Sequence, residues 1–523
     1  MVLYLAVGIL ILAPACMLVL RSVRPGFAYQ WLLAAAGAVI AWLSVLGLGL
    51  QIPQTLQPAP WGPGGVYPAS PVLLVDQISW LFGVALATLL LATILTEVGR
   101  ETHLRWSAWA GALFLTALGL LGVFAANPLT LLLVWNACDL AETGLALILE
   151  EKTESRRSAI SAFAIRLVGS FSLLAGISLS SPDPGFLSLS GSPRVYPLLF
   201  LAAFLRLAVL PVNPPALSER PLRAGLGTVG RLLAVSTAMV LLVRTAGEPG
   251  ALADQTIAAA PWITLTGLIA VYAGASWLLA EDALDGRPAW ILGLAMMTMA
   301  SVLRGQADAA LAWALACVFS GGLVFLSSVR SRISAWVAFT GILGISAVPF
   351  TPAWAGAMLL SPVSEPVTSF LFLFALVFIL AGYYRYTIHQ REYLSGGERW
   401  VTALYPLGLA LLPLSHFVLG SFIRPSTGNF IVWVIGPFAG VLAAGWVFWE
   451  RRGGRFPMLV LNVMDAIFSL RWAASLLGLI YQIGGRFIYF LTSVMEGDGG
   501  VLWVLLLVIL LIASLVIGSG VTP

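Results

Sequence analysis

Residues 128–149 read PLTLLLVWNACDLAETGLALIL, an apolar run of 22 residues that holds Asp139 and Glu142 near its middle. About 20 apolar residues in an α-helix reach across the hydrocarbon core of a bilayer. The run therefore predicts a membrane-spanning helix. The two acids are three residues apart and share one helix face. An ionisable group inside the membrane is costly, so each is a hypothesis for a functional site.

Similar runs recur along the whole chain. The 523 residues are 60% hydrophobic and 10% charged, with a mean hydropathy of +0.97, whereas soluble domains carry roughly 25% charged residues. We therefore predict an all-α polytopic membrane protein with about 16 transmembrane helices. The predicted spans are 2–20, 28–50, 72–96, 106–126, 128–149, 159–178, 195–211, 225–243, 259–280, 289–303, 307–328, 334–352, 366–384, 400–421, 429–449 and 500–519.

The loop charges agree with this count. Joints after odd-numbered spans carry 18 Lys and Arg residues, and joints after even-numbered spans carry four. Because cytoplasmic loops collect basic residues, both termini are expected on the non-cytoplasmic side of the membrane. The net charge of +4 comes from these loop arginines, so it does not indicate nucleic-acid binding. The composition excludes a soluble enzyme.

Five regions are expected along the chain. Residues 1–105 form N-terminal transmembrane helices, 106–384 a core of two inverted repeats, and 385–450 C-terminal transmembrane helices. Residues 451–499 form an amphipathic lateral segment, because apolar residues recur there at helical spacing among charged ones. A loop with two short interfacial helices is the alternative for that segment. Residues 500–523 hold the final transmembrane helix.

Two proline pairs mark a weak internal repeat. LAVLPVNP at 207–214 resembles ISAVPFTP at 345–352, and both follow an apolar run. Proline removes a backbone donor, so Pro211, Pro214, Pro349 and Pro352 predict breaks in the seventh and twelfth helices. Transporters with inverted repeats place broken helices at matching positions in each half. Ordinary helix ends are the alternative interpretation.

Five ionisable residues fall inside consecutive predicted spans. Asp139 and Glu142 lie in the fifth span, and Arg166, Arg206 and Arg231 in the sixth, seventh and eighth. Together they form a candidate proton or ion path, to which Asn136 adds a polar contact one turn away. A purely structural lock between helices is the alternative.

Two further candidates are weaker. Asp76 begins the third span, where a helix N-terminus favours an anion, so a capping role is an equal alternative. His416 in the fourteenth span has a side chain that titrates near neutral pH and is a candidate relay. A hydrogen-bonded packing role is the alternative. We find no buried acid or base in the ninth to thirteenth predicted spans.

Three stretches of the sequence resemble motifs of a known protein family. The motifs NPLTLLLVWN at 127–136, the break at 207–211 and GILGISAVPF at 341–350 are similar to those of the antiporter-like membrane subunits of respiratory complex I. That family includes Mrp-type cation/proton antiporters and the membrane arms of energy-converting hydrogenases. The resemblance covers roughly residues 70–360. It implies broken seventh and twelfth helices, a lateral helix before the last span, and a central line of charged residues that passes protons.

The departures from the family concern its charged residues. Asn136 stands where the resemblance implies a glutamate, and Ser170 where it implies an acid. Arg206 aligns with a lysine, and Arg231 falls where a lysine or histidine is expected. In the second half, two expected lysines find Gly321 or Ser320 and the WAGA run at 354–357. A guanidinium stays protonated in proteins, so Arg206 cannot carry a proton as a buried lysine does.

The leading hypothesis is an antiporter-like subunit of a complex-I-related assembly with an altered or partly lost proton-translocation path. A secondary ion-coupled or proton-coupled transporter, including one for inorganic carbon, and a non-conducting structural scaffold are the alternatives. The chain itself has no catalytic site; any oxidoreductase chemistry of a proton-translocating complex would belong to partner subunits. Three scattered cysteines and three histidines indicate no flavin, haem, iron–sulfur or other metal site. The expected partners are other membrane subunits and the lipid bilayer, with protons or sodium as candidate ions. The expected location is a bacterial or archaeal cytoplasmic (inner) membrane.

Overall fold

A computed structural model gives the fold of this chain. It describes residues 2–24, 27, 29–57, 70–98, 106–179, 195–207, 217–246, 256–327, 329–330, 332–361, 366–388, 392–393, 399–423 and 430–452, with 463, 486, 505–506 and 508–510. Residues 1–468 form one compact unit and 469–523 a second. The account below concerns the first unit.

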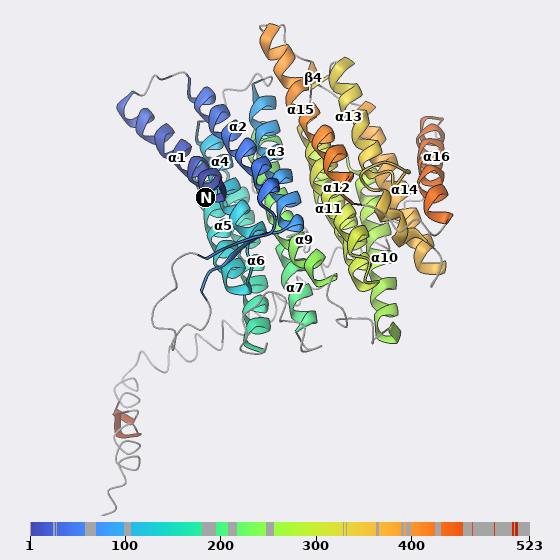
Figure 1. Ribbon diagram of the computed structural model, residues 1–523, viewed down its shortest axis with the longest axis horizontal. Coiled ribbons are helices and arrows are strands. Elements are labelled where there is room, and N and C mark those ends of the chain that lie inside the picture. Colours follow the sequence, from blue (N-terminus) through green and yellow to red (C-terminus); the bar gives the residue numbers. More distant parts are fainter. Residues whose placement is uncertain are drawn as a thin grey trace, which may run out of the picture. The chain divides into compact units, whose positions relative to one another are not determined.

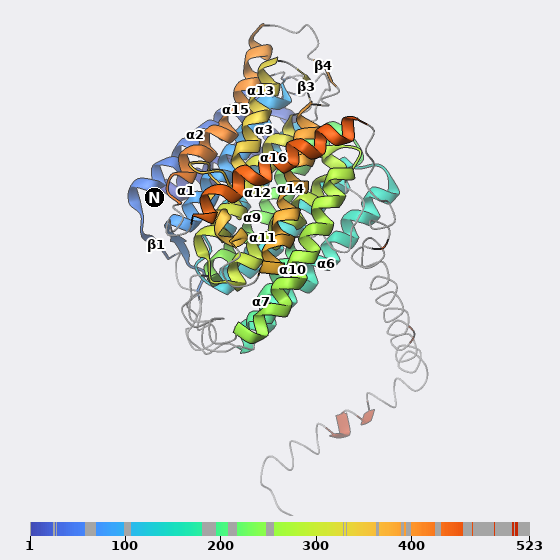
Figure 2. The ribbon, with the colours of Figure 1, turned by 90° about the vertical axis from the view of Figure 1, so that its right-hand side faces the viewer.

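The described residues of this unit form a bundle of α-helices with four very short strands (Figures 1 and 2). The first half contains α1 (Val2–Val23), α2 (Gln30–Leu48), η1 (Gly49–Gln51), β1 (Gln54–Leu56), β2 (Leu73–Val75), α3 (Gln77–Glu97), α4 (Trp106–Val123), α5 (Pro128–Leu149), α6 (Thr153–Leu179), α7 (Tyr196–Arg206), α8 (Arg220–Ala224) and α9 (Leu226–Ala246). The second half contains α10 (Thr256–Leu279), α11 (Ala283–Leu303), α12 (Ala307–Leu326), β3 (Val329–Arg330), α13 (Arg332–Ile345), η4 (Trp354–Leu360), α14 (Pro366–Ile388), β4 (Glu392–Tyr393), α15 (Arg399–Gly420) and α16 (Ile431–Arg451).

The predicted membrane architecture is confirmed. Thirteen described helices are long and apolar enough to cross a membrane, and two shorter apolar helices, Tyr196–Arg206 and Ile333–Ile345, accompany them. Each of these fifteen helices overlaps one of the first fifteen predicted spans, although several ends differ, as where α13 ends at Ile345 and the predicted span at 352. The predicted lateral segment and the last span, 500–519, lie almost wholly outside the described residues.

The predicted repeat reappears in the packing of the helices. In the first half α4 packs on α5 and α9, α5 on α6, α6 on α7, and α7 on α9. In the second half α10 packs on α11 and α14, α11 on α12, α12 on α13, and α13 on α14. The two sets of five spans therefore have the same neighbour relations. Because five is an odd number, equivalent spans in a continuous series enter the membrane from opposite sides.

The two halves meet along the central helices α3, α9, α11 and α12. α9 packs on α3, α11 and α12, and α3 packs on α12 and α15. Figure 1 shows α1, α2, α4 and α5 on one side of this centre and α10, α14 and α16 on the other. The central helices are almost wholly buried, as expected for helices enclosed by protein, and the membrane-spanning part of α12 is 100% buried.

Local sequence signals explain where the key helices begin. Asn127 accepts a hydrogen bond from the backbone amide of Thr130, and Pro128 occupies the first turn of α5, as expected of a cap followed by a proline. Asp76 and Ser79 form a reciprocal capping box at the start of α3. The paired strands β1 and β2 lie beside these starts, and the Val72 amide donates to the Thr130 hydroxyl.

The start of α11 differs from the sequence prediction in a way that matters for the site. The tenth predicted span begins at 289, where the apolar run begins. In the structure α11 begins at Ala283 and contains Pro288 in its second turn. Arg287, assigned from the sequence to a loop, therefore lies inside a membrane helix and is 6% exposed.

Candidate functional site

The charged residues of the first half converge on the middle of α5. The Asp139 carboxylate is 1% exposed and lies between two guanidiniums. Arg166 of α6 donates to its Oδ1 atom at 3.3 Å, and Arg206 of α7 forms an ion pair with its Oδ2 atom. The acid thus joins three helices through one side chain.

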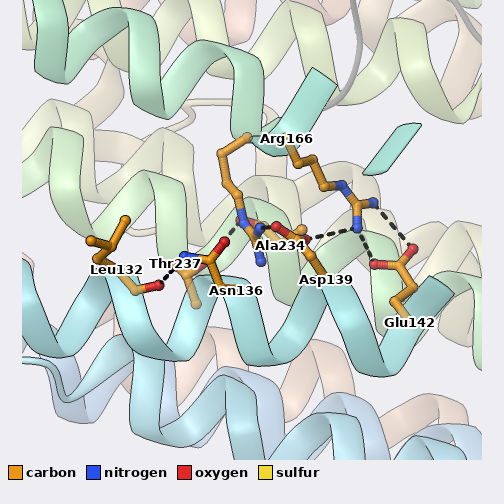
Figure 3. A network of polar contacts seen from close by, with 8 residues as sticks. Leu132, Asn136, Asp139, Glu142, Arg166, Ala234 and Thr237 are labelled. Atoms are coloured by element: carbon orange, nitrogen blue, oxygen red, sulfur yellow. Dashed lines mark hydrogen bonds and ion pairs between the residues drawn. The ribbon is translucent and has the colours of Figure 1, made fainter. Parts of the chain in front are cut away.

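Glu142 lies one turn further along α5 and shares Arg166. The Arg166 guanidinium donates through Nη1 to Glu142 Oε2 and, at 3.1 Å, through Nη2 to Oε1. Figure 3 shows the Arg166 side chain reaching both acids, which lie on one face of α5. The i,i+3 spacing of the acids thus lets a single arginine engage both.

Asn136 contributes less than its position suggests. Its amide donates to the Leu132 carbonyl of the preceding turn at 2.8 Å, and Figure 3 shows this contact directed back along α5. Asp139 lies about one helical turn further along the same face of α5.

Arg206 occupies an apolar setting. Its guanidinium lies 5.3 Å from the Trp135 ring centroid, and its exposed fraction is 1%. Within the described residues its Nε and Nη2 atoms have no hydrogen-bond partner. The Asp139 carboxylate and the aromatic face of Trp135 therefore stabilise a buried cation that does not lose its proton.

A cavity adjoins Glu142 on the side facing α9 and α11. Its volume is about 50 Å³, enough for roughly three to five waters by the usual minimum volume for one water. Among its lining residues are four charged ones, Glu142, Arg223, Arg231 and Arg287. Arg231 is the predicted site residue of the eighth span. Arg287 is the charged residue that the sequence prediction missed, because the tenth predicted span begins at 289 whereas α11 begins at Ala283.

Arg287 corrects the prediction that the ninth to thirteenth spans hold no buried acid or base. Its Nη1 atom donates to the Arg223 carbonyl at 3.0 Å and to the Thr228 hydroxyl at 3.1 Å. Its guanidinium carbon lies 5.9 Å from the Phe325 ring centroid. The line of charge thus extends from α7 through α5 and α9 to α11, at the edge of the second half.

Beyond Arg287 the line of charge stops. A side-chain carbon added at Gly321 would lie 2.6 Å from Trp290 Nε1, and one added at Gly356 would lie 2.5 Å from the Trp313 ring. Trp290 and Trp313 are both fully buried. Each indole therefore fills the space beside a glycine at or next to a position where the family resemblance implies a lysine. The described residues of α12 to α15 contain no buried Asp, Glu, Lys or Arg.

His416 lies apart from this line. It is 2% exposed and stacks on Phe319 of α12 with ring centroids 5.0 Å apart. A side-chain carbon at Gly344 would lie 2.9 Å from its Nδ1 atom. This geometry is that of a packed histidine between α12, α13 and α15, and its role as a relay stays a prediction.

Asp76 acts as a cap and an ion-pair partner. Besides capping α3, its carboxylate accepts from Arg244 Nη2 at 3.1 and 3.2 Å. Arg244 lies in the last turn of α9 and is 6% exposed. The pair ties the start of α3 to the end of α9, away from the Asp139 network.

The helix break of the second half is described and that of the first half is not. Pro211 and Pro214 lie outside the described residues. α13 ends at Ile345, and the chain passes Pro349 and Pro352 before η4 begins at Trp354. Ala347 and Phe350 have φ angles of 53° and 65°, uncommon values for residues with side chains. Gly436 of α16 packs directly on this segment, because a side-chain carbon there would lie 2.2 Å from the Ala347 carbonyl oxygen.

Solved structures with this arrangement of helices include subunits of three membrane complexes. The chain matches a subunit of the Mrp complex from a Dietzia species with a TM-score of 0.68 and 15% identity, over 99% of this chain and 63% of that one. A subunit of the membrane-bound sulfane sulfur reductase, an archaeal respiratory membrane complex, matches with a TM-score of 0.67 and 15% identity, over 98% and 100%. A subunit of respiratory complex I from Thermus thermophilus matches with a TM-score of 0.62 and 20% identity, over 85% and 99%.

The chain has the fold of the antiporter-like membrane subunits. The resemblance noted from the sequence motifs is therefore confirmed for the fold. The chain spans 63% of the length of the Mrp subunit. No protein-family model matches the sequence, and no curated protein matches it either.

Proposed function

We propose that this chain is an antiporter-like membrane subunit of a multi-subunit assembly related to complex I, and that its own proton path is altered and incomplete. The main support for this proposal is the chemical nature of the group that pairs with Asp139. An arginine, Arg206, occupies the place where the resemblance implies a lysine, and it is buried in an ion pair. A proton-transferring lysine must lose and regain its proton, whereas a guanidinium keeps it.

The second half supports the same proposal. Trp290 and Trp313 fill the space beside Gly321 and Gly356, where a chain of titratable groups and water would otherwise run. Interiors are close-packed, and a water chain needs polar partners. A proton that reaches Glu142 therefore meets no buried Asp, Glu, Lys or Arg among the described residues of α12 and α13.

Purification of the intact assembly tests the subunit role. The full chain, tagged and extracted in mild detergent, is expected to carry further polytopic membrane subunits and redox subunits with it in fixed proportion. Recovery of a chain with no stoichiometric partner would favour the secondary transporter. Recovery with partners but without any redox or ion-coupled activity in the complex would favour the structural scaffold.

Flux measurements test the incomplete path. The purified full chain in liposomes with an internal pH-sensitive dye is expected to pass protons no faster than protein-free liposomes under an imposed membrane potential. A proton flux well above that background, abolished by Glu142→Gln, would overturn the incomplete path. The same liposomes carrying Glu154→Gln, a substitution on the exposed start of α6, are the matched control.

A further inference from the structure

The helix α16 lies at the outer edge of the described bundle, as Figures 1 and 2 show. It packs on α14 and η4, and its membrane-spanning part is 28% buried. Its buried residues share one face of the helix: Val432, Gly436, Ala439, Ala443 and Val447. The opposite face of α16 therefore points out of the described part of the bundle.

A stripe of four residues runs along this outer face. Val441, Gly445, Phe448 and Arg452 follow one another at spacings of four, three and four residues, which keeps them on one side of a helix. Val441 is 70% and Phe448 55% exposed. A side-chain carbon added at Gly445 would meet nothing within 4 Å. The stripe is therefore an apolar surface with a notch at Gly445, between two larger side chains.

The stripe ends in two exposed arginines. The guanidinium carbon of Arg452 lies 4.2 Å from the Phe448 ring centroid, and Arg451 precedes it in the last turn of α16. Both arginines are exposed. The neighbouring acid, Glu450, has its carboxylate 3.9 Å from Arg385 of α14. The acid of this helix end is thus engaged on the side of α14, while the stripe itself ends in a cation that lies on an aromatic ring.

Aromatic side chains mark this end of α16 as the level of the membrane surface. The Trp446 and Trp449 rings lie 5.2 Å apart, and Trp449 is 45% exposed. Tryptophan and arginine collect where a helix leaves the hydrocarbon. From Val441 to Arg452 a helix rises by about 16 Å, roughly half of the ~30 Å hydrocarbon core. The stripe therefore has the length of one lipid leaflet.

We propose that this face of α16 binds one anionic phospholipid, with its phosphate at Arg451 and Arg452 and an acyl chain along Val441, Gly445 and Phe448. Guanidiniums bind phosphate oxygens through paired hydrogen bonds. Basic residues at the membrane surface favour anionic over zwitterionic headgroups. The site does not depend on the proposed function, because it uses none of the residues of the Asp139 network.

Lipid titrations of the full chain in mild detergent, followed by native mass spectrometry, test the site. Dioleoyl phosphatidylglycerol is the anionic probe and dioleoyl phosphatidylcholine, in a separate titration, the zwitterionic one. We expect the first phosphatidylglycerol to bind about tenfold more tightly than the first phosphatidylcholine, as two surface arginines predict. Equal dissociation constants for the two lipids would overturn the proposal.

Arg452→Gln tests the headgroup contact. The variant should bind phosphatidylglycerol about fivefold more weakly, with a smaller effect on phosphatidylcholine. Arg157→Gln is the matched control, because Arg157 is also an exposed arginine near a helix end and its loop is expected on the same side of the membrane. It should keep the wild-type preference. An equal loss in the two variants would mean that any surface arginine serves, and the site would be refuted.

Gly445→Leu tests the acyl-chain contact without changing any charge. Filling the notch should weaken phosphatidylglycerol binding by about fourfold, the equivalent of one methylene group kept out of contact. Gly440→Leu is the control on the same helix, because a side-chain carbon there also meets nothing within 4 Å but Gly440 lies off the stripe. Equal weakening by the two substitutions would contradict the acyl-chain contact.

Thermal unfolding separates lipid binding from two other roles of this face. Cations in the last turn also complement the helix dipole. If Arg452 did only that, Arg452→Gln would lower the unfolding midpoint equally with and without phosphatidylglycerol. We expect instead equal midpoints without lipid and a smaller rise with it than in the wild type. If a second copy of the chain covered the face, Gly445→Leu would change the oligomeric mass in detergent, and the lipid site would be refuted.

Discussion

Asp139 of α5 and Arg206 of α7 form an ion pair in which each side chain is 1% exposed. Arg166 contacts the other oxygen of the same carboxylate. Removing one partner of a buried pair leaves an uncompensated charge, which typically costs about 3–5 kcal/mol. Asp139→Asn should therefore lower the thermal unfolding midpoint of the purified chain far more than Asp282→Asn, which removes a surface partner 30% exposed. Equal shifts for the two variants would show that the buried pair is not stabilising.

Arg206→Lys tests the proposed reason for the incomplete proton path. A lysine at this place keeps a positive charge beside Asp139 but is able to release its proton. Because the filled second half offers no described route beyond Glu142, liposomes with Arg206→Lys should still pass protons no faster than the background under the same membrane potential. Arg206→Gln removes the charge without adding a titratable group and is the control. A flux above background in Arg206→Lys but not in Arg206→Gln would show that the guanidinium alone limits the path and that the packing of the second half does not.

Trp290→Ala tests whether the second half is filled by aromatic packing. Trp290 is fully buried, contacts Trp277 and Phe325, and its indole donates to the Cys317 carbonyl at 3.2 Å. Truncating a buried tryptophan usually costs about 3–5 kcal/mol because a cavity remains. We expect a large fall in the unfolding midpoint. Trp336→Ala, on a ring 73% exposed, should change it little, and a comparable fall would contradict the packing role.

The sequence-based prediction agrees best with the structure for features that depend on many residues at once. Apolar run length and loop charge predicted fifteen of the described helices, because each depends on about 20 residues at once. The spacing of Asp139 and Glu142 likewise predicted one shared face, since helix geometry fixes it. Arg287 escaped prediction because the apolar run that marks the tenth span begins only at 289, whereas the helix begins at Ala283. The match of Trp290 to Gly321 could not be predicted, because it joins two helices whose relative rotation depends on packing.

Glu150 should make stability depend on pH. The carboxylate lies at the end of α5 and accepts from the Ser218 amide at 2.6 Å and the Ser218 hydroxyl at 2.8 Å. Burial alone would raise its pKa, but the hydrogen bonds from Ser218 and the Lys152 amide outweigh it and hold the pKa below the ordinary value of 4.5. A lowered pKa gives stability that is present above pH 4.5 and lost as the pH falls through the folded-state value.

The measurement compares Glu150→Gln with the wild type from neutral pH downward. The variant should unfold at a lower temperature near pH 7, and the difference should shrink as the pH falls below 4.5. Glu151→Gln, which replaces an exposed neighbouring carboxylate, should follow the wild-type curve closely. A difference that is constant across the pH range would mean that the hydrogen bonds do not favour the ionised carboxylate.

Gly436 allows α16 to cover the broken segment after α13. Backbone groups without helical partners are tolerated at membrane depth where protein covers them, and the Ala347 carbonyl oxygen lies 2.2 Å from where a side-chain carbon at Gly436 would be. Gly436→Ala must therefore push α16 away and lower the unfolding midpoint. Gly440 lies one turn further on α16 with nothing within 4 Å, so Gly440→Ala should raise stability by about 0.5–1 kcal/mol through helix propensity alone. The opposite signs of two identical substitutions on one helix isolate the contact with the break from the intrinsic preference of the helix for alanine.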